Sequence, residues 1–137
     1  MKKNHFIIRP KYIIAIIMSM AILVFSFPSQ AQLNTKKKTI SERKFERKMQ
    51  KKNAVVLDVR TTEEFQAGHL PGAVNIDVQK DDFGQNIQPL DKSKTYLVYC
   101  KSGRRSEKAL KMLYDAGFKN AYHLKGGITA WQGATEK

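Results

Sequence analysis

The sequence predicts an α/β sandwich, in which helices flank a mainly parallel sheet. Short apolar runs rich in β-branched residues recur between residues 54 and 124. Runs of this kind are typical of strands buried on both faces of a parallel sheet. Between them lie segments with helix-capping patterns or helical spacing of apolar residues. Strands that alternate with helices indicate an α/β fold.

The first 31 residues have the pattern of a secretory signal peptide. Residues 1–11 carry four Lys or Arg and no acid, and residues 12–27 are almost continuously apolar. Ser29 and Ala31 then place small residues at the −3 and −1 positions of a cleavage site. We expect cleavage after Ala31 and export, with the bacterial periplasm as the compartment. The alternative is an uncleaved membrane anchor, although a helix of about 24 Å is short for a hydrocarbon core of about 30 Å.

The strongly basic composition belongs mainly to the N-terminal part of the chain. The sequence has 25 Lys or Arg against 12 Asp or Glu, a net charge of +13. Residues 36–52 hold nine of these bases and two acids, whereas residues 53–137 hold twelve bases and ten acids. The basic run allows a weak contact with a membrane surface, but a solvated helix face is its more common meaning. Export argues against a nucleic-acid partner.

A polar lead-in, residues 32–38, precedes one predicted domain, residues 39–137. The spacing of Thr39 and Glu42 fits a capping box. It predicts a helix over residues 41–51, with the side chains of Phe45, Met49 and the preceding Ile40 facing the core.

A first strand is predicted over residues 54–59. Thr61 and Glu64 repeat the capping-box spacing and predict a short helix that ends near Gly68. The Pro71-Gly72 turn then leads to a second strand over residues 73–76.

The second half continues the alternation. Residues 77–90 are polar, with a possible helical turn at 82–87, and strands are predicted over 95–99 and 121–124. Between these strands, residues 106–116 have apolar side chains at helical spacing, and Gly117 suits the C-terminal cap. The Gly126-Gly127 pair leads to a last helical turn that carries Trp131.

This topology places candidate site residues at one edge of the sheet. Ligands of open parallel sheets bind beyond the carboxyl ends of the strands. Asp58 and Arg60 leave one strand there and Cys100 leaves another, so we expect them to be neighbours. Cys100 is the chain's only cysteine, so no internal disulfide is possible. Neither a metal nor a cofactor is predicted, because Cys100, His69 and His123 lack ligand-pair spacing.

The loop after Cys100 has the composition of an anion-binding nest. It runs into a helix N-terminus, where unpaired backbone N–H groups and the helix dipole favour negative charge. Gly103 permits a tight turn. Together with Lys101, Arg104 and Arg105, this environment predicts a thiol pKa below the free value of about 8.5. The alternative is a buried cysteine that acts as a small apolar residue.

Loop length distinguishes two chemistries for this thiol. Cysteine phosphatases use Cys-x5-Arg, which would place the arginine at position 106, and the chain has Ser106 there. Arg105 instead closes a six-residue loop, whose smaller ring suits one added sulfur atom better than a phosphoryl group. Phosphatase or arsenate reductase chemistry is therefore the less favoured alternative. A cysteine hydrolase would need a histidine base, but both His69 and His123 have the settings of structural histidines.

Three motifs resemble those of a known family. CKSGRRS (100–106) is similar to the active-site loop of single-domain rhodaneses, C-x-x-G-x-R-S. LDVRTTEEFQAGHLPGAVNI (57–76) is similar to the first signature of that family, and GGITAW (126–131) to its C-terminal one. The resemblance covers residues 39–132 and has the motifs in the family's order.

The resemblance implies a three-layer sandwich with about five strands. It also implies transfer of a sulfane sulfur from a donor such as thiosulfate to cyanide or a thiol, through a persulfide on Cys100. The backbone amides of Lys101, Ser102, Gly103, Arg104 and Arg105 would cradle the sulfur, and Arg105 and Ser106 would shape the loop. The resemblance assigns mainly structural, supporting roles to Asp58, Arg60, His69 and the Gly126-Gly127 pair.

The partners expected from this chemistry are small molecules. With no second cysteine to resolve the persulfide, the acceptor must come from outside the chain. The charges of Lys101 and Arg104 should favour a dianionic donor such as thiosulfate. A persulfide carrier or thiol-binding module without rapid turnover is the alternative function, and we expect a monomer.

Overall fold

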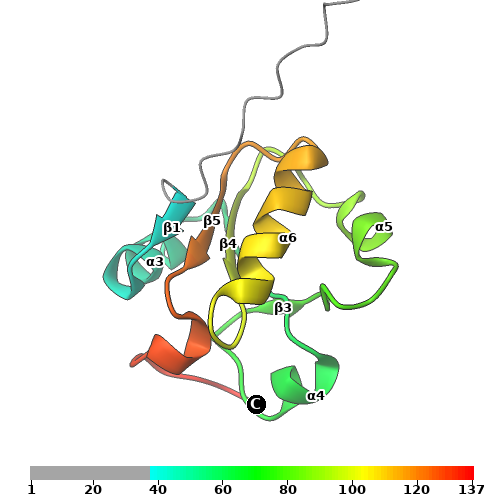
Figure 1. The fold of residues 1–137 in the computed structure, drawn as a ribbon. Coiled ribbons are helices and arrows are strands. Elements are labelled where there is room, and N and C mark those ends of the chain that lie inside the picture. The colour runs from blue at the N-terminus through cyan, green and yellow to red at the C-terminus, as the bar shows by residue number, and fades with distance from the viewer. Residues whose placement is uncertain (1–37) are drawn as a thin grey trace, which may run out of the picture. The chain divides into compact units, whose positions relative to one another are not determined.

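A five-stranded parallel sheet organises residues 38–137, the part of the chain that this computed structural model describes (Figure 1). Its strand order is β1-β5-β4-β2-β3. The strands are β1 (Thr39–Ile40), β2 (Ala54–Asp58), β3 (Val74–Asn75), β4 (Thr95–Tyr99) and β5 (Ala121–Leu124). The predicted fold class is therefore confirmed. The predicted signal segment lies outside the described residues, and none of the helices within 38–137 has the length and apolar content needed to cross a membrane.

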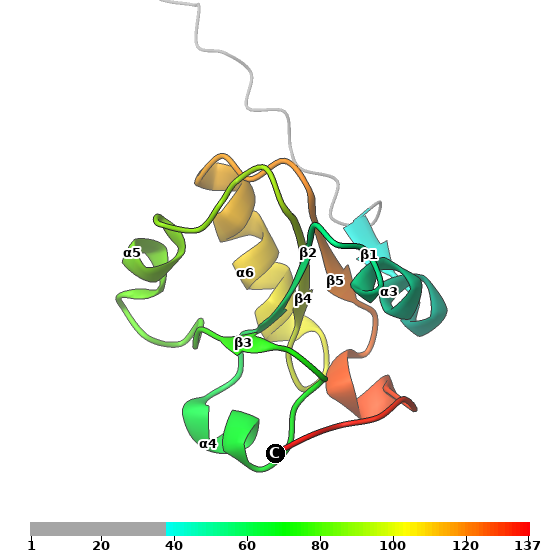
Figure 2. The ribbon, with the colours of Figure 1, turned by 180° about the vertical axis from the view of Figure 1, so that it is seen from behind.

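Helices cover both faces of this sheet and make the fold three-layered. The helices are α3 (Glu42–Met49), α4 (Thr62–Gln66), α5 (Phe83–Ile87), α6 (Arg104–Asp115) and the 3₁₀ helix η1 (Gly127–Ala130). Helices α6 and α5 lie on one face of the sheet, and α3 lies on the opposite face. Figure 2 shows the domain of Figure 1 from behind. Helix α4 lies near the carboxyl end of the sheet (Figure 1).

Each face has its own apolar core, as expected for strands buried on both sides. On the α6 side, Leu57 and Val98 of the sheet pack with Leu110 of α6 and Phe83 of α5. On the α3 side the cluster consists of Ile40, Phe45, Val56, Leu70, Leu97, Tyr99 and Leu124. Met49 and Trp131 are partly buried against this second cluster, and the rings of Trp131 and Phe45 meet edge to face.

The first predicted capping box is wrong. Thr39 lies in strand β1, paired in parallel with β5, and the residue that precedes helix α3 is Ser41. The side chain of Ser41 makes no capping hydrogen bond. Pairing with β5 satisfies backbone groups of Thr39 and Ile40 that a helix start would have left unpaired. The second capping box, at Thr61 and Glu64, is confirmed with both of its hydrogen bonds.

Helix α6 begins two residues earlier than predicted, at Arg104 rather than at position 106. Gly103 precedes it with φ of 104°, a left-handed conformation that glycine adopts without strain. Arg104 and Arg105 therefore belong to the first turn of the helix. The loop between β4 and α6 is reduced to residues 100–103.

Candidate functional site

Cys100 lies at the carboxyl end of β4, the central strand of the sheet. Its neighbours in the sheet are β5 on one side and β2 on the other. The residue is 1% exposed and belongs to the apolar cluster under α6. The thiol is thus buried at the point where the strand turns into the loop that leads to α6.

Several hydrogen-bond donors surround the buried sulfur. The Gly103 amide donates to Cys100 Sγ at 3.1 Å, and Ser106 Oγ lies 3.5 Å from it. Burial alone would raise the pKa of the thiol. Hydrogen bonds from the Ser106 hydroxyl and from the backbone amides of Ser106, Gly103 and Ser102 outweigh that effect, so the pKa lies below its ordinary value. Thiolate stabilisation therefore rests chiefly on hydrogen-bond donors, whereas the sequence pointed to the basic side chains as well.

The loop amides face the sulfur because the loop carbonyls are held on the other side. Ile128 N donates to the Cys100 carbonyl at 2.8 Å, and Thr129 N donates to the Lys101 carbonyl at 3.1 Å. Thr129 Oγ1 also donates to the Lys101 carbonyl, at 2.8 Å. The start of η1 therefore binds the two carbonyls that open the loop. This arrangement directs the Ser102 amide, which shares a peptide unit with the Lys101 carbonyl, toward Cys100.

Gly127 makes this contact between η1 and the loop possible. It has φ of 60°, and a Cβ atom there would lie 2.5 Å from the Lys101 carbonyl oxygen and closer still to that of Cys100. Two backbones meet here at a distance that only glycine allows. Gly127, one of the two glycines that the family resemblance marked as support, thus positions the loop directly.

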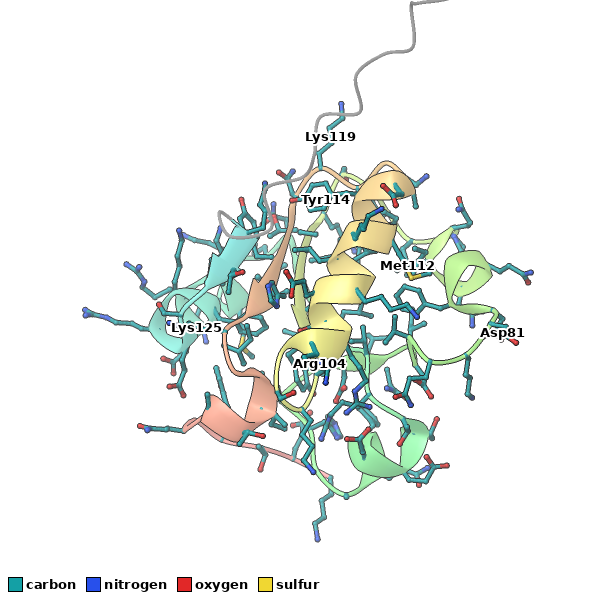
Figure 3. The ribbon with its side chains drawn as sticks, viewed as in Figure 1. Asp81, Arg104, Met112, Tyr114, Lys119 and Lys125 are labelled. Carbon is teal, nitrogen blue, oxygen red and sulfur yellow. The ribbon has the colours of Figure 1, made fainter. Side chains whose placement is uncertain are left out.

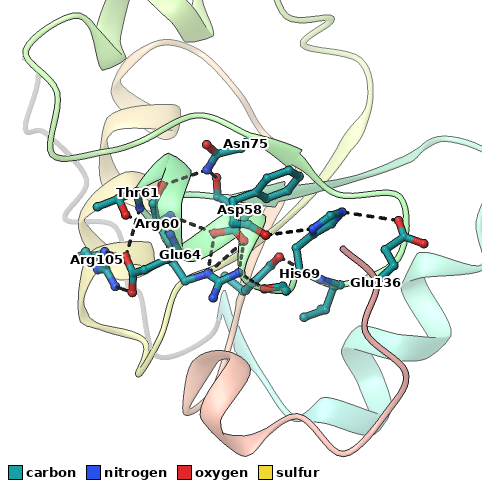
Figure 4. A network of polar contacts seen from close by, with 12 residues as sticks. Asp58, Arg60, Thr61, Glu64, His69, Asn75, Arg105 and Glu136 are labelled. Atoms are coloured by element: carbon teal, nitrogen blue, oxygen red, sulfur yellow. Dashed lines mark hydrogen bonds and ion pairs between the residues drawn. The ribbon is translucent and has the colours of Figure 1, made fainter.

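Arg105 is held by an ion pair with helix α4 (Figure 4). Its guanidinium nitrogens lie 2.5 and 2.8 Å from the two carboxylate oxygens of Glu64. Glu64 also accepts a hydrogen bond from the Thr61 amide as part of the capping box. The hydrogen bonds from Arg105 hold the pKa of Glu64 at about 2, against the opposing effect of burial. A single carboxylate thereby joins the start of α4 to the first turn of α6.

A cleft of about 430 Å³ adjoins the loop. Its lining residues are Gln79, Ser102, Arg104, Arg105 and Lys108. Arg104 and Lys108 lie one helical turn apart on α6 and are both exposed. Arg104 projects at the end of α6 nearest the loop, far from Lys119 at the opposite end of the domain (Figure 3). Lys101, which the sequence analysis placed at the mouth, is not among the lining residues.

Asp58 and Arg60 form a buried structural pair beside the site. Arg60 donates to both Asp58 oxygens, at 2.6 Å in the shortest contact, and to the Gly68 carbonyl at 2.7 Å. Asn75 donates to the carbonyls of both residues and joins β3 to this pair (Figure 4). Asp58 lies opposite Tyr99 in the sheet register, which brings the pair close to the end of β4 as expected.

His69 is part of the scaffold around the α4 end of the domain. Its ring stacks on Phe65 with centroids 3.8 Å apart, and its Nδ1 contacts the Phe65 carbonyl at 3.1 Å. Its backbone pairs in both directions with Glu136, which attaches the C-terminal segment. These contacts fit the structural role that the sequence analysis assigned to His69.

Four residues at the site escaped sequence analysis as functional candidates. They are Gln79, Lys108, Thr129 and, beyond its capping role, Glu64. The helical periodicity of α6 could have identified Lys108, because it lies four residues after Arg104. The sequence carries no local signal for the other contacts, since their partners are distant in the chain.

The chain matches the family model described as a rhodanese-like domain over residues 41–134. It is 40% identical over 81 residues to the "Putative sulfurtransferase YtwF" of Bacillus subtilis, covering 59% of this chain and 76% of that protein. It is also 44% identical over 79 residues to a tRNA uridine(34) hydroxylase of Cytophaga hutchinsonii, covering 56% of this chain but only 25% of that protein. Among solved structures, a rhodanese-like domain protein from Staphylococcus aureus is similar with a TM-score of 0.64 and 31% identity. That match covers 72% of this chain and 96% of the other.

Replacing Gly127 by alanine is expected to disrupt the loop. The added Cβ would push apart η1 and the Cys100 and Lys101 carbonyls, so the amides would turn away from the sulfur. We expect a loss of about 2 kcal/mol or more in the free energy of unfolding and a higher thiol pKa, measured by denaturant unfolding and by the pH dependence of alkylation. Gly84→Ala in α5 is the control, because a Cβ there meets no atom within 4 Å. Equal behaviour of the two variants would contradict the assignment.

Replacing Glu64 by glutamine is expected to change how the free energy of unfolding depends on pH, because it removes the ion pair with Arg105. Glutamine preserves the capping box but removes the charge that binds Arg105. Because the folded carboxyl has its pKa depressed from 4.5 to about 2, the stabilisation is present above pH 4.5 and is lost as the pH falls toward 2. We expect wild type to exceed the variant by about 1–2 kcal/mol at pH 7, and the difference to vanish near pH 2 in denaturant unfolding. Glu46→Gln on the exposed face of α3 is the matched control, because it removes one carboxylate charge on a different helix.

Proposed function

Because the chain belongs to the family of rhodanese-like domains, we propose that it transfers a sulfane sulfur through a persulfide on Cys100. Sulfur transfer is the general chemistry that the family and the sulfurtransferase-named relative support. The observation that carries the specific proposal is the buried Cys100 sulfur, which accepts a hydrogen bond from the Gly103 amide and lies 3.5 Å from Ser106 Oγ. Such a setting stabilises a negatively charged sulfur. A persulfide carries that charge.

The proposed reaction has two half-steps, each a displacement at sulfur. The Cys100 thiolate attacks the outer sulfur of thiosulfate, a new S–S bond forms, and sulfite leaves with the electron pair of the broken S–S bond. An acceptor thiolate or cyanide then attacks the outer sulfur of the persulfide, and Cys100 leaves as the thiolate. The loop amides hold the negative sulfur at both stages. The acceptor is external, because the chain has no other cysteine.

The cleft beside the loop supports an anionic sulfur donor. Arg104 and Lys108 line it from one face of α6, and the Arg105 charge is shared with Glu64. We therefore assign donor attraction to Arg104 and Lys108, and not to Lys101. A dianion such as thiosulfate gains most from two positive charges at the mouth.

A persulfide carrier is the second candidate, and the near-complete burial of Cys100 favours it. Restricted access would slow attack by the acceptor and prolong the life of the persulfide. The two functions differ in turnover and share the same cysteine. The first experiment below separates them.

We further propose that residues 1–31 direct export and are removed after Ala31. The pattern of bases, apolar residues and small residues in that segment supports this proposal. Expression in a bacterial host, followed by intact-mass measurement of the periplasmic fraction, tests it. A mature chain that begins at Gln32 is expected. Full-length protein retained in the membrane fraction would point to the anchor instead.

Replacing Cys100 by serine is expected to abolish turnover. Mixing the protein with thiosulfate and cyanide should produce thiocyanate for the wild type and only background for the variant, because serine cannot form a persulfide. Mass spectrometry of the wild type after thiosulfate alone should show one added sulfur. That adduct without turnover would favour the carrier, and hydrolysis of an aryl phosphate would contradict the sulfur assignment.

Neutralising the cleft is expected to weaken use of the anionic donor. The double variant Arg104→Gln, Lys108→Gln should lower kcat/KM for thiosulfate by about tenfold at low salt, and added salt should narrow the gap. A neutral organic polysulfide donor should be much less affected. The control Lys94→Gln, Lys119→Gln removes the same charge from exposed residues just before β4 and β5. Equal losses in both double variants would indicate a general effect of net charge.

A further inference from the structure

Hydrogen bonds continue from the Cys100 sulfur through Ser106 to His123 and Thr39, two residues that the proposed function does not use. Ser106 Oγ lies 3.5 Å from Cys100 Sγ and 3.2 Å from His123 Nδ1. His123 Nε2 lies 2.8 Å from Thr39 Oγ1. His123 is 5% exposed on β5, and Thr39 is its register partner on β1. A continuous chain of polar atoms thus joins the sulfur to strand β1.

The single hydrogen of the Ser106 hydroxyl is the variable element of this chain. Three acceptors can compete for it: the Cys100 sulfur, the Gly103 carbonyl at 2.9 Å, and His123 Nδ1 when that nitrogen carries no hydrogen. If His123 accepts from Ser106, the hydrogen is drawn away from the sulfur. If His123 donates, the hydrogen stays available to the sulfur and to the Gly103 carbonyl.

The second arrangement is the one in which the Thr39 hydroxyl donates to His123 Nε2, a direction that their 2.8 Å contact allows. A threonine hydroxyl that donates to Nε2 leaves the proton of a neutral imidazole on Nδ1, which then donates to Ser106 Oγ. Burial keeps the ring neutral by lowering the pKa of His123, against an opposing effect of the Glu107 carboxylate on α6. At the other end of the chain of hydrogen bonds, the Arg105 guanidinium interacts electrostatically with Cys100. Neither charge lies in the chain of hydrogen bonds itself.

We propose that His123 is a positioning residue, whose Nδ1–H, set by Thr39, keeps the Ser106 hydroxyl hydrogen available to the Cys100 thiolate. This inference rests on the proposed role of Cys100 as the nucleophile. It makes the reactivity of the thiol depend on a histidine that does not contact it. His123 acts here as a neutral donor and not as a general base, because Ser106 stands between it and the sulfur.

The test measures the thiol pKa of Cys100 from the pH dependence of iodoacetamide alkylation, in the full chain and without any sulfur donor. The variants are His123→Leu, His123→Asn, Ser106→Ala and the double variant Ser106→Ala, His123→Leu. Leucine removes both ring nitrogens at similar volume. The asparagine amide nitrogen occupies the place of Nδ1 and keeps the donor to Ser106. Denaturant unfolding of each variant shows whether it folds.

We expect His123→Leu to raise the thiol pKa by about one pH unit, as does the loss of one hydrogen bond to a charged group. His123→Asn should stay near the wild-type value. Ser106→Ala should also raise the pKa, and adding His123→Leu to it should produce no further shift. An unchanged thiol pKa in His123→Leu would overturn the proposal. The proposal would also be overturned if His123→Leu shifted the thiol pKa equally in the wild-type and Ser106→Ala backgrounds.

Thr39→Val provides an independent route if His123→Leu does not fold. It removes the donor to Nε2 at nearly constant shape, and we expect a rise in the thiol pKa smaller than that for Ser106→Ala. No rise in Thr39→Val would overturn the role of the tautomer. Because alkylation requires no sulfur transfer, the two proposals fail separately. A normal titration series without thiocyanate formation would contradict only the proposed function.

Discussion

The binding of two loop carbonyls by the start of η1 is the constraint on which the site depends. A peptide unit points its N–H and C=O in opposite directions, so holding the Lys101 carbonyl on one side presents the Ser102 amide, one of those that lower the pKa of Cys100, on the other. Hydrogen bonds to a buried sulfur then favour its charged form, despite the unfavourable effect of burial. The order of strands makes this possible. Because β5 lies beside β4, the segment that follows β5 reaches the loop that follows β4.

Hydrogen bonds and charges have separate tasks at this site. Backbone amides and the Ser106 hydroxyl act on the sulfur itself, at distances of 3.1–3.5 Å for the contacts to Gly103 and Ser106. The charge of Arg105 is paired with that of Glu64 and joins the first turn of α6 to α4. Arg104 and Lys108 remain at the cleft, where long-range attraction of an anion is effective.

The surroundings of the loop explain how so small a domain keeps this geometry. Glu64 couples α4 to the first turn of α6, and the Asp58–Arg60 pair couples the end of β2 to the turn at Gly68. Asn75 then joins β3 to both carbonyls of that pair. Buried polar groups of this kind are stable only when their partners are all in place. Each connection therefore restricts the position of the next.

The sequence by itself determined the elements whose signals are local. Strands β2, β4 and β5 are predicted within one residue, because uninterrupted apolar runs leave few alternatives. The Thr61 capping box depends only on four consecutive residues. The composition of the loop after Cys100 is likewise a local pattern, and it predicts an anion-binding nest. The tertiary structure decided the rest. Thr39 has the same capping spacing as Thr61, yet it joins a strand, because its partner is His123, 84 positions away. The connection from His123 to the sulfur, the role of Thr129 and the cleft position of Lys108 likewise arise from packing. Hydrogen bonds between distant residues leave no pattern in a single sequence, since nothing in the local residues specifies which strand will lie beside them.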